Sequence, residues 1–255
     1  MILAVDIGNT NVKLGFFEND CLTKSFKMTT VINRTSDEYS AMLVQMMTNN
    51  GIAVSSVSGA ILSCVIPQLE YTFVNLIKNL FGVKPILVGV GVKTGLSIKY
   101  EFPKQLGSDR IVTCVAAIKK YGAPFVLVDF GTATTFNVVN EKKEFLGGCI
   151  TLGIKAKSDS LSSKTSKLPS VQLERPKKTV CTNTTNAIQS GIVFGTVGEV
   201  KYIVQRIIQE TGLSDAKIIA TGGLAEIIED IEHMFDVVDR QLSLFGLNEI
   251  YKLNA

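Results

Sequence analysis

Residues 5–14 read VDIGNTNVKL, and residues 128–137 read VDFGTATTFN. In both segments an apolar run ends in an aspartate, and a glycine stands two positions after that aspartate. Apolar residues on both sides of a glycine-containing turn predict a β-hairpin. Asp129 comes 123 positions after Asp6, close to half the length of the 255-residue chain. The alternative is two unrelated hairpins with similar turns, but the shared aspartate, glycine and apolar flanks favour an internal duplication.

Strand and helix patterns alternate along the rest of the chain. Apolar runs predict strands over residues 2–6, 11–17, 59–65, 84–90, 125–129 and 136–139. Capping signals or helical spacing predict helices over residues 35–47, 71–81 and 183–210. Pro67 is expected in a turn. This order predicts an α/β protein with mixed sheets flanked by helices, organised as an N-terminal half, 1–115, and a C-terminal half, 116–255.

The composition excludes several classes of protein. A chain with 46% hydrophobic and 19% charged residues can bury a core, so it is not intrinsically disordered. The 26 basic and 23 acidic residues leave a net charge of +3, which argues against a nucleic-acid partner bound by bulk electrostatics. No apolar run approaches the roughly 18 residues that span a membrane, and Asp6 argues against a signal peptide.

The cysteines and the histidine point to a cytoplasmic protein without a histidine-based site. The five cysteines are far apart and odd in number, so we interpret them as reduced thiols rather than disulfides or zinc ligands. His233 is the single histidine, which excludes a multi-histidine metal site and disfavours a histidine-dependent triad.

The two turns that follow Asp6 and Asp129 have the composition of phosphate-binding loops. Each offers backbone N–H groups, threonine or asparagine side chains, and one carboxylate beside which a cation can neutralise phosphate charge. A third segment, IIATGGLAEII at 218–228, predicts a strand, a glycine turn and a helix N-terminus that a base or ribose can approach. Each motif alone is weak, but the three in this order predict a nucleotide site.

The motifs resemble those of the acetate kinase, sugar kinase, Hsp70 and actin superfamily, whose duplicated halves clamp ATP. Within it, nearly the whole chain is similar to the type III pantothenate kinase family. The matching segments are DIGNTN (6–11), RTSDEY (34–39), VKTGL (92–96), GSDRIV (107–112), VDFGTATTF (128–136), LGG (146–148), AIQSG (187–191), ATGGLA (220–225) and LFGLNEIY (244–251).

The resemblance implies a fold, a reaction and partners. The fold is the duplicated ribonuclease-H-like (actin-like ATPase) fold. The reaction is the ATP-dependent phosphorylation of pantothenate to 4'-phosphopantothenate, the first step of coenzyme A biosynthesis. Mg²⁺, a monovalent cation (K⁺ or NH₄⁺) and a homodimer are also implied.

Asp109 matches the family's catalytic base. It lies at the predicted start of a helix beside Arg110, and we expect the helix N-terminus to lower its pKa. An ionised carboxylate at this position is suited to accept the proton of a primary hydroxyl. The alternative from the sequence alone is a helix cap with a surface partner.

The other site residues also follow from the resemblance. Asp6 matches the residue that orients magnesium, through water, and Asp129 matches the monovalent-cation ligand. The expected ATP-binding residues are Asp6, Gly8, Asn9, Thr10, Asn11, Lys13, Gly131, Thr132, Gly222 and Gly223. The expected substrate contacts are Tyr100, Gly107, Ser108, Asp109, Arg110 and Thr184. An arginine and hydroxyl donors suit the carboxylate and amides of pantothenate, but Tyr100 in the core and Thr184 as a helix cap are alternatives.

Two stretches of the C-terminal half have an unusual composition. Residues 155–178 are rich in serine and basic residues, which indicates either a solvated loop with a short helix or a lid near an anionic ligand. Gly191, Gly195 and Gly198 lie on one face of the predicted helix, where glycine weakens a helix. We expect another backbone to pack there, from a helix of the same chain or from a second subunit.

A few residues depart from the family pattern near the expected substrate pocket. Leu152 replaces a proline, and Glu101-Phe102 replace a polar pair. The acidic residue common soon after position 152 is absent, and Lys155 and Lys157 stand nearby. These departures leave open a kinase of the same superfamily that acts on another small alcohol. A non-catalytic regulatory relative is a further alternative. The presence of Asp6, Asp109 and Asp129 argues against it, because a regulator needs none of the three.

Overall fold

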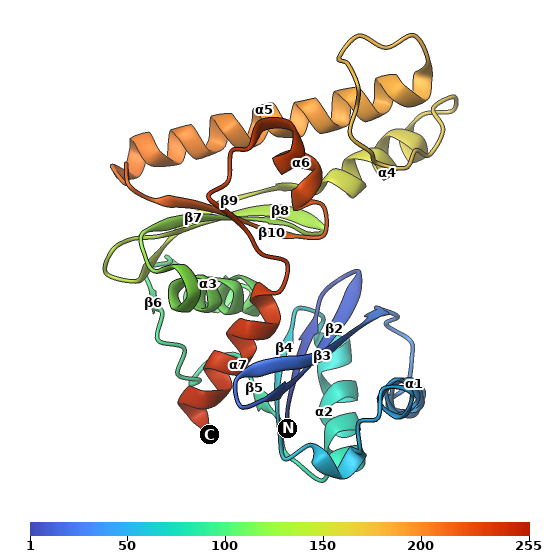
Figure 1. Cartoon of the computed structure of the whole chain (residues 1–255), viewed down its shortest axis with the longest axis vertical. Coiled ribbons are helices and arrows are strands. Elements are labelled where there is room, and N and C mark those ends of the chain that lie inside the picture. The colour runs from blue at the N-terminus through green and yellow to red at the C-terminus, as the bar shows by residue number, and fades with distance from the viewer. The chain divides into compact units, whose positions relative to one another are not determined.

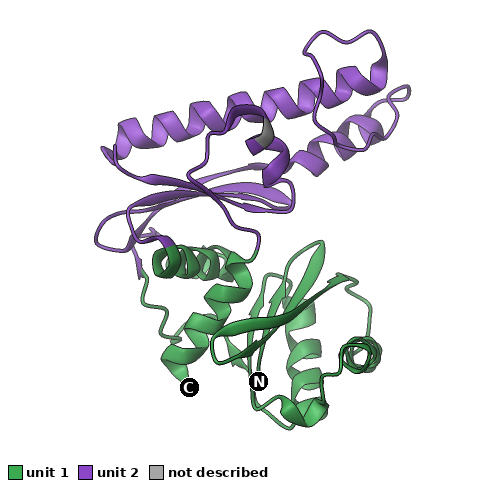
Figure 2. Cartoon of the chain, in the orientation of Figure 1, with its two compact units in different colours: residues 1–96, 102–120, 241–255 green, residues 97–101, 121–240 purple. Residues whose placement is uncertain are grey.

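The structure is a computed structural model that describes residues 1–229 and 231–255. The chain forms two compact units (Figures 1 and 2). Unit 1 contains residues 1–96, 102–120 and 241–255, and unit 2 contains residues 97–101 and 121–240. Within the described ranges, no helix is both long enough and apolar enough to cross a lipid bilayer.

Unit 1 is built on a five-stranded sheet of order β3-β2-β1-β4-β5. Its strands are β1 (Ile2–Ile7), β2 (Asn11–Glu18), β3 (Cys21–Thr29), β4 (Gly59–Cys64) and β5 (Ile86–Leu87). The first three strands are antiparallel neighbours, while β4 pairs in parallel with β1 and β5. Residues 2–5 of β1 are all apolar because both faces of this central strand are covered.

Helices cover both faces of this sheet. The helical segments of unit 1 are α1 (Ser36–Asn49), α2 (Pro67–Phe81), α3 (Ser108–Tyr121), α7 (Leu242–Asn254) and the 3-10 turns η1 (Val54–Ser56) and η2 (Pro103–Gln105). Phe16 of β2 belongs to the core shared with α1 and α2. Successive strand residues point to opposite faces, so the adjacent Phe17 contacts Phe245 of α7 on the other side.

Local sequence signals explain how the helices of unit 1 begin. Thr35 and Glu38 form the predicted capping box at the start of α1. The prediction that Pro67 lies in a turn is wrong, because Pro67 is the first residue of α2. Proline suits that position, since the N–H that it lacks would have no partner within the helix. The strand predicted over residues 84–90 is confined to β5.

Unit 2 contains a six-stranded sheet of order β11-β10-β7-β8-β9-β6. Its strands are β6 (Ser97–Ile98), β7 (Phe125–Phe130), β8 (Ala133–Val139), β9 (Glu144–Leu152), β10 (Lys217–Gly222) and β11 (Val237–Val238). The order β9-β8-β7-β10-β11 reproduces β3-β2-β1-β4-β5, with the same parallel and antiparallel pairs. Both β7 and β9 begin and end 123 positions after β1 and β3. The predicted duplicated ribonuclease-H-like fold is therefore confirmed.

Three helices pack on one face of the second sheet: α4 (Ile154–Lys164), α5 (Thr184–Thr211) and α6 (Ala225–Glu232) (Figure 1). Helix α5 is 28 residues long and lies beside α4. The short helix expected within residues 155–178 is α4, and residues 165–178 form no helix or strand.

Candidate functional site

The first glycine turn joins β1 to β2 and is tightly closed. The Gly8 N–H donates to the Asn11 carbonyl at 3.0 Å. A Cβ atom at Gly8 would lie 3.2 Å from the same oxygen, so the closed turn leaves little room for a side chain there. Asn9 and Thr10 at its tip are exposed. The turn therefore presents backbone and polar side chains to solvent at the carboxyl end of a buried strand, as a phosphate-binding loop requires.

Asp6 lies just before this turn and is only 6% exposed. Lys13 is its cross-strand neighbour in β2, and the Lys13 ammonium lies 3.7 Å from the Asp6 carboxylate. Lys13 also donates to the buried Ser243 hydroxyl in the first turn of α7, at 3.3 Å. A single carboxylate suits magnesium that keeps several waters and substrate phosphate oxygens as its other ligands. Within the described part of the chain, no three histidine, cysteine or acidic side chains gather as a metal site.

Asp109 lies in the first turn of α3, and this turn is tied to the sheet. The hydroxyls of Ser108 and Ser63 are hydrogen-bonded at 2.9 Å, and Ser63 is fully buried near the end of β4. Because β1 and β4 run in parallel, with Asp6 and Ser63 in register, both strands end at the same sheet edge. Asp6 and Asp109 come close enough there for the charge of Asp6 to affect the pKa of Asp109.

The prediction that the helix N-terminus lowers the pKa of Asp109 is wrong in direction. Burial raises the pKa of this carboxyl, and the negative charge of Asp6 raises it further. The Arg110 backbone N–H donates to the Asp109 carboxylate at 2.9 Å, and this bond opposes the rise without cancelling it. A raised pKa brings the carboxylate closer to the basicity that a proton acceptor needs near neutral pH.

Gly107 has a steric role that follows from the position of Asp109. A Cβ atom at Gly107 would lie 2.4 Å from the Asp109 Oδ1 atom, so any larger residue would push this carboxylate out of its present orientation. Arg110 is 7% exposed within α3. Contacts of Gly107, Ser108 and Arg110 with a substrate stay a prediction.

The second glycine turn belongs to unit 2 and repeats the features of the first. The Gly131 N–H donates to the Ala133 carbonyl at 3.2 Å, and Thr132 is exposed at the tip. Asp129 is in register with Thr135 of β8 and Thr221 of β10. A carboxylate flanked by two hydroxyl-bearing residues is an oxygen-rich set that suits a hard cation.

The third predicted motif is also in unit 2, at the end of β10. Gly222 has a φ of +97°, and a Cβ atom there would lie 2.5 Å from the Phe130 carbonyl oxygen. Glycine at this position lets β10 approach the end of β7 closely. A Cβ atom at Gly223 would meet nothing within 4 Å, so this backbone is open to approach by a ligand.

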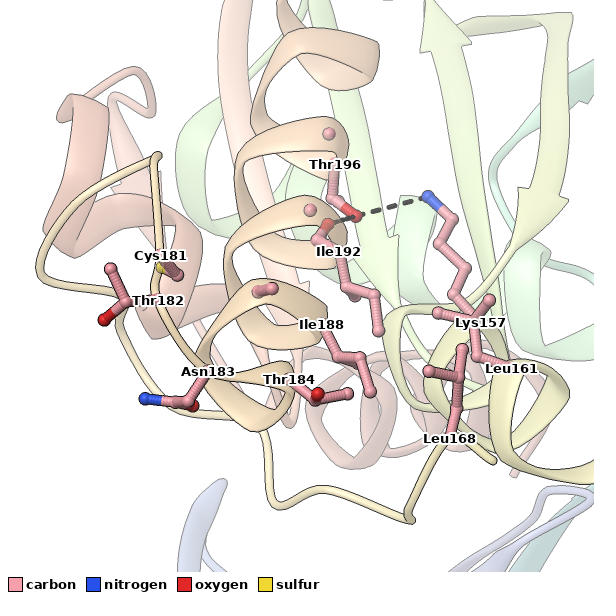
Figure 3. Close-up of a pocket in the computed structure, with 13 residues that line it drawn as sticks. Lys157, Leu161, Leu168, Cys181, Thr182, Asn183, Thr184, Ile188, Ile192 and Thr196 are labelled. Carbon is pink, nitrogen blue, oxygen red and sulfur yellow. Dashed lines mark hydrogen bonds between the residues drawn. The ribbon is translucent and has the colours of Figure 1, made fainter. Parts of the chain in front are cut away.

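Thr184 and Tyr100 are the two expected substrate contacts in unit 2. Asn183 is the N-cap of α5, so the interpretation of Thr184 as a helix cap is wrong. Thr184 lines a groove of about 780 Å³ between α4 and α5 (Figure 3). Tyr100 is partly exposed rather than buried in the core, and its ring packs edge-on against Phe145 with centroids 5.9 Å apart.

Gly191 and Gly195, on the glycine face of α5, line the same groove. Cβ atoms built at Gly191, Gly195 and Gly198 would meet nothing within 4 Å, so the expectation that a helix of the same chain packs there is wrong. Lys157 of α4 donates to the Thr196 hydroxyl at 3.2 Å (Figure 3). The same ammonium group pairs with Glu199 of α5. The sequence does not predict this pair, because nothing local to either residue indicates a partner in another helix.

Comparison with known proteins gives one family and several structures of the same fold. A chain from Campylobacter jejuni, provisionally assigned to the Baf family of transcriptional activators, is 21% identical, with 99% and 98% of the two chains covered and a TM-score of 0.62. A provisional 2-dehydro-3-deoxygalactonokinase from Sinorhizobium meliloti is 10% identical, with 99% and 96% covered and a TM-score of 0.63.

Component A of (R)-2-hydroxyglutaryl-CoA dehydratase from Acidaminococcus fermentans is also 10% identical, with 98% and 96% covered and a TM-score of 0.56. These three likenesses show the fold. The family is shown separately, by a type III pantothenate kinase model that matches residues 2–206. The chain therefore belongs to the type III pantothenate kinase family, whose members are phosphotransferases with an alcohol group as acceptor.

Proposed function

We propose that the chain transfers the γ-phosphoryl group of ATP to the primary hydroxyl of pantothenate and yields 4'-phosphopantothenate. The observation that carries this proposal is the pair of carboxylates, Asp6 and Asp109, at one edge of the first sheet in a chain of this family. A carboxylate beside a phosphate turn together with a second, more basic carboxylate is what a kinase for an alcohol needs.

Asp109 accepts the hydroxyl proton as the pantothenate oxygen attacks the γ-phosphorus in line. The new P–O bond forms while the bond to the β-phosphate oxygen breaks, and ADP leaves. Gly107 keeps the Asp109 carboxylate unobstructed, and the bond between Ser63 and Ser108 holds the start of its helix. Most of the acceleration then comes from positioning and from electrostatic stabilisation of the transferred group.

The phosphates of ATP are held by the glycine turns in this proposal. Asn9, Thr10 and Asn11 of the first turn and Thr132 of the second supply donors, and Lys13 neutralises charge. Asp6 orients magnesium through water, and Asp129 binds a monovalent cation. Both ions, when bound, offset the negative charge that the phosphates carry into the reaction.

We further propose that a second copy of the chain covers the glycine face of α5. The support is the groove itself, since three exposed glycines on one helix face allow close approach of another backbone.

Tyr100, Arg110 and Thr184 contact pantothenate in the proposed reaction. The proposal also places the protein in the cytoplasm.

The decisive experiment measures ATP consumption with pantothenate, magnesium and potassium. The wild-type chain is compared with Asp109→Asn, and potassium is replaced by sodium in a parallel assay. Turnover that requires pantothenate and potassium and collapses in the variant supports the substrate, the cation and the base together. A folded chain that binds ATP but does not turn over with pantothenate contradicts the proposed reaction.

A second candidate is the phosphorylation of another small alcohol. The observation in its favour is the exposure of Phe102 and Leu152, apolar side chains at two of the positions that depart from the family pattern. A panel of small alcohols assayed under the same conditions distinguishes the two candidates. A kcat/KM at least tenfold higher for another alcohol than for pantothenate favours the second.

A further inference from the structure

The strand that follows each hairpin ends against the glycine turn of that hairpin. In unit 1, the residue after β3 is Thr30. Its hydroxyl donates to the Gly8 carbonyl at 2.7 Å, and its backbone N–H donates to the Thr10 carbonyl at 3.0 Å. One residue from the third strand thus engages two carbonyl groups of the first phosphate turn.

Unit 2 repeats this contact at the equivalent position. Gly153, the residue after β9, lies 123 positions after Thr30, which is the offset that relates the two halves. Its N–H donates to the Thr132 carbonyl at 3.2 Å, and a Cβ atom there would lie 2.4 Å from that oxygen. The residue after the third strand therefore donates hydrogen bonds to the glycine turn in each half. In unit 1 the donors are the hydroxyl and the N–H of Thr30, and in unit 2 the donor is the N–H of Gly153.

The orientation of these carbonyl groups matters for anion binding. A turn binds phosphate when its N–H groups face the ligand, and a carbonyl oxygen that turned toward the ligand would repel the phosphate oxygens. A carbonyl that already accepts a hydrogen bond from Thr30 is held in place, since turning away would leave an unsatisfied polar group. We infer that Thr30 is a positioning residue for ATP, because its hydroxyl fixes the backbone of the Gly8–Asn11 turn in the phosphate-binding orientation.

This inference rests on the proposed function and assigns a role to a strand that carries none of the expected site residues. Thr30 contacts the turn rather than the nucleotide, so its loss weakens ATP binding and leaves the chemical step intact. The expected sign of the change is a higher KM for ATP with little change in kcat or in the KM for pantothenate.

The test compares Thr30→Val, which removes the hydroxyl at nearly constant volume, with Thr30→Ser, which retains it. Thr23→Val is the matched control. Thr23 lies in β3, and its hydroxyl donates to the Phe16 carbonyl of β2 at 2.9 Å. This is also a bond from a threonine hydroxyl to a backbone carbonyl, but it is remote from the turn. The affinity for magnesium–ATP is measured by titration calorimetry, kcat and both KM values by turnover, and stability by thermal unfolding.

We expect Thr30→Val to weaken ATP binding about tenfold, the change that follows from about 1.4 kcal/mol. Thr30→Ser and Thr23→Val should bind ATP like the wild type. Wild-type affinity in Thr30→Val, or an equal loss in Thr23→Val, overturns the inference while the proposed function stands. A wild-type chain that binds no ATP overturns both. Should Thr30→Val not fold at the assay temperature, Thr30→Ala supplies the same comparison.

Discussion

At the scale of single residues, the most informative side chain is Asp109, because the environment that suits its proposed role as proton acceptor also works against stability. Its pKa is raised in the folded state, mainly by burial and then by Asp6. A carboxyl with a raised pKa favours folding while it is protonated and loses that contribution as the pH rises through its folded pKa. Above that pKa, the charged group therefore opposes folding.

Asp109→Asn removes this charge while its side-chain oxygen can still accept the Arg110 N–H. We expect turnover to fall about 100-fold or more. The melting temperature above neutral pH should rise by about 2–4 °C if about 1 kcal/mol is released. At acidic pH, where Asp109 is protonated, the gain should vanish. Thermal unfolding at several pH values measures this, and an unchanged or lower melting temperature above neutral pH contradicts it.

Gly107 offers a second test at this scale. The methyl group of Gly107→Ala would lie 2.4 Å from the Asp109 Oδ1 atom, so the carboxylate must move. We expect kcat to fall by about tenfold or more, while ATP affinity stays close to that of the wild type. Gly89→Ala is the control, because a Cβ atom there would meet nothing within 4 Å. Equal kcat values for the two variants would refute a steric role for Gly107.

The sequence predicts the two aspartate-containing turns better than it predicts the environment of Asp109. The spacing of Asp6 and Asp129 around similar turns is local, and so it is visible without a structure. The pKa of Asp109 depends on how deeply α3 is buried and on the distance to Asp6, which only the fold determines. The hydrogen bond between Ser63 and Ser108 joins segments 45 residues apart, so no local sequence pattern predicts it.

At the scale of elements, the apolar pattern predicts the central strands and misses the outer ones. The buried runs of β1 and β7 are continuous and easily recognised. The side chains of β3 are largely exposed, and Gly147 and Gly148 interrupt β9, so neither strand has a strong periodic signal. β3 and β9 are the two strands that hold the proposed phosphate-binding turns. The strands with the weakest apolar pattern are therefore the ones to which this proposal gives a functional role.

Helix α5 supports a prediction about assembly. Gly191 is exposed on its glycine face, where an added Cβ atom would meet no atom of the same chain within 4 Å. We expect Gly191→Leu to keep or raise the stability of the isolated fold, because glycine weakens a helix by about 1 kcal/mol. The same change should dissociate the proposed dimer.

Sedimentation velocity at micromolar protein measures the assembly of Gly191→Leu. Gln209→Leu, at an exposed position nearer the end of the same helix, serves as the control. A wild-type chain that sediments as a monomer, or a dimer that tolerates Gly191→Leu, contradicts the proposed interface.

At the scale of the whole molecule, the last segment of the chain completes the unit that the first segment begins. Helix α7 packs on β1, β2 and β4, and Leu242, Leu244, Leu247 and Ile250 are almost fully buried. Burying four such side chains contributes roughly 6–12 kcal/mol. This is comparable with the 5–15 kcal/mol that stabilises a typical domain. Neither composition nor the duplication predicts that α7 belongs to unit 1.

Removal of residues 241–255 should therefore unfold unit 1 and abolish ATP binding. Unit 2 has its own core and should keep its protection against amide hydrogen exchange. Deletion of Ala255 alone is the control, because Asn254 still bonds the backbone of Lys93. Retained protection of β1 and β4 in the longer deletion would show that α7 is dispensable.

The placement of α7 also has a consequence for how the protein is made. On the ribosome, residues 1–120 emerge first, but their sheet lacks one covering helix until residues 242–254 have left the exit tunnel. Residues 121–240 form an almost continuous unit that is synthesised in between. Unit 2 can therefore fold before residues 242–254 are synthesised, whereas the half that carries Asp6 and Asp109 can be completed only after them.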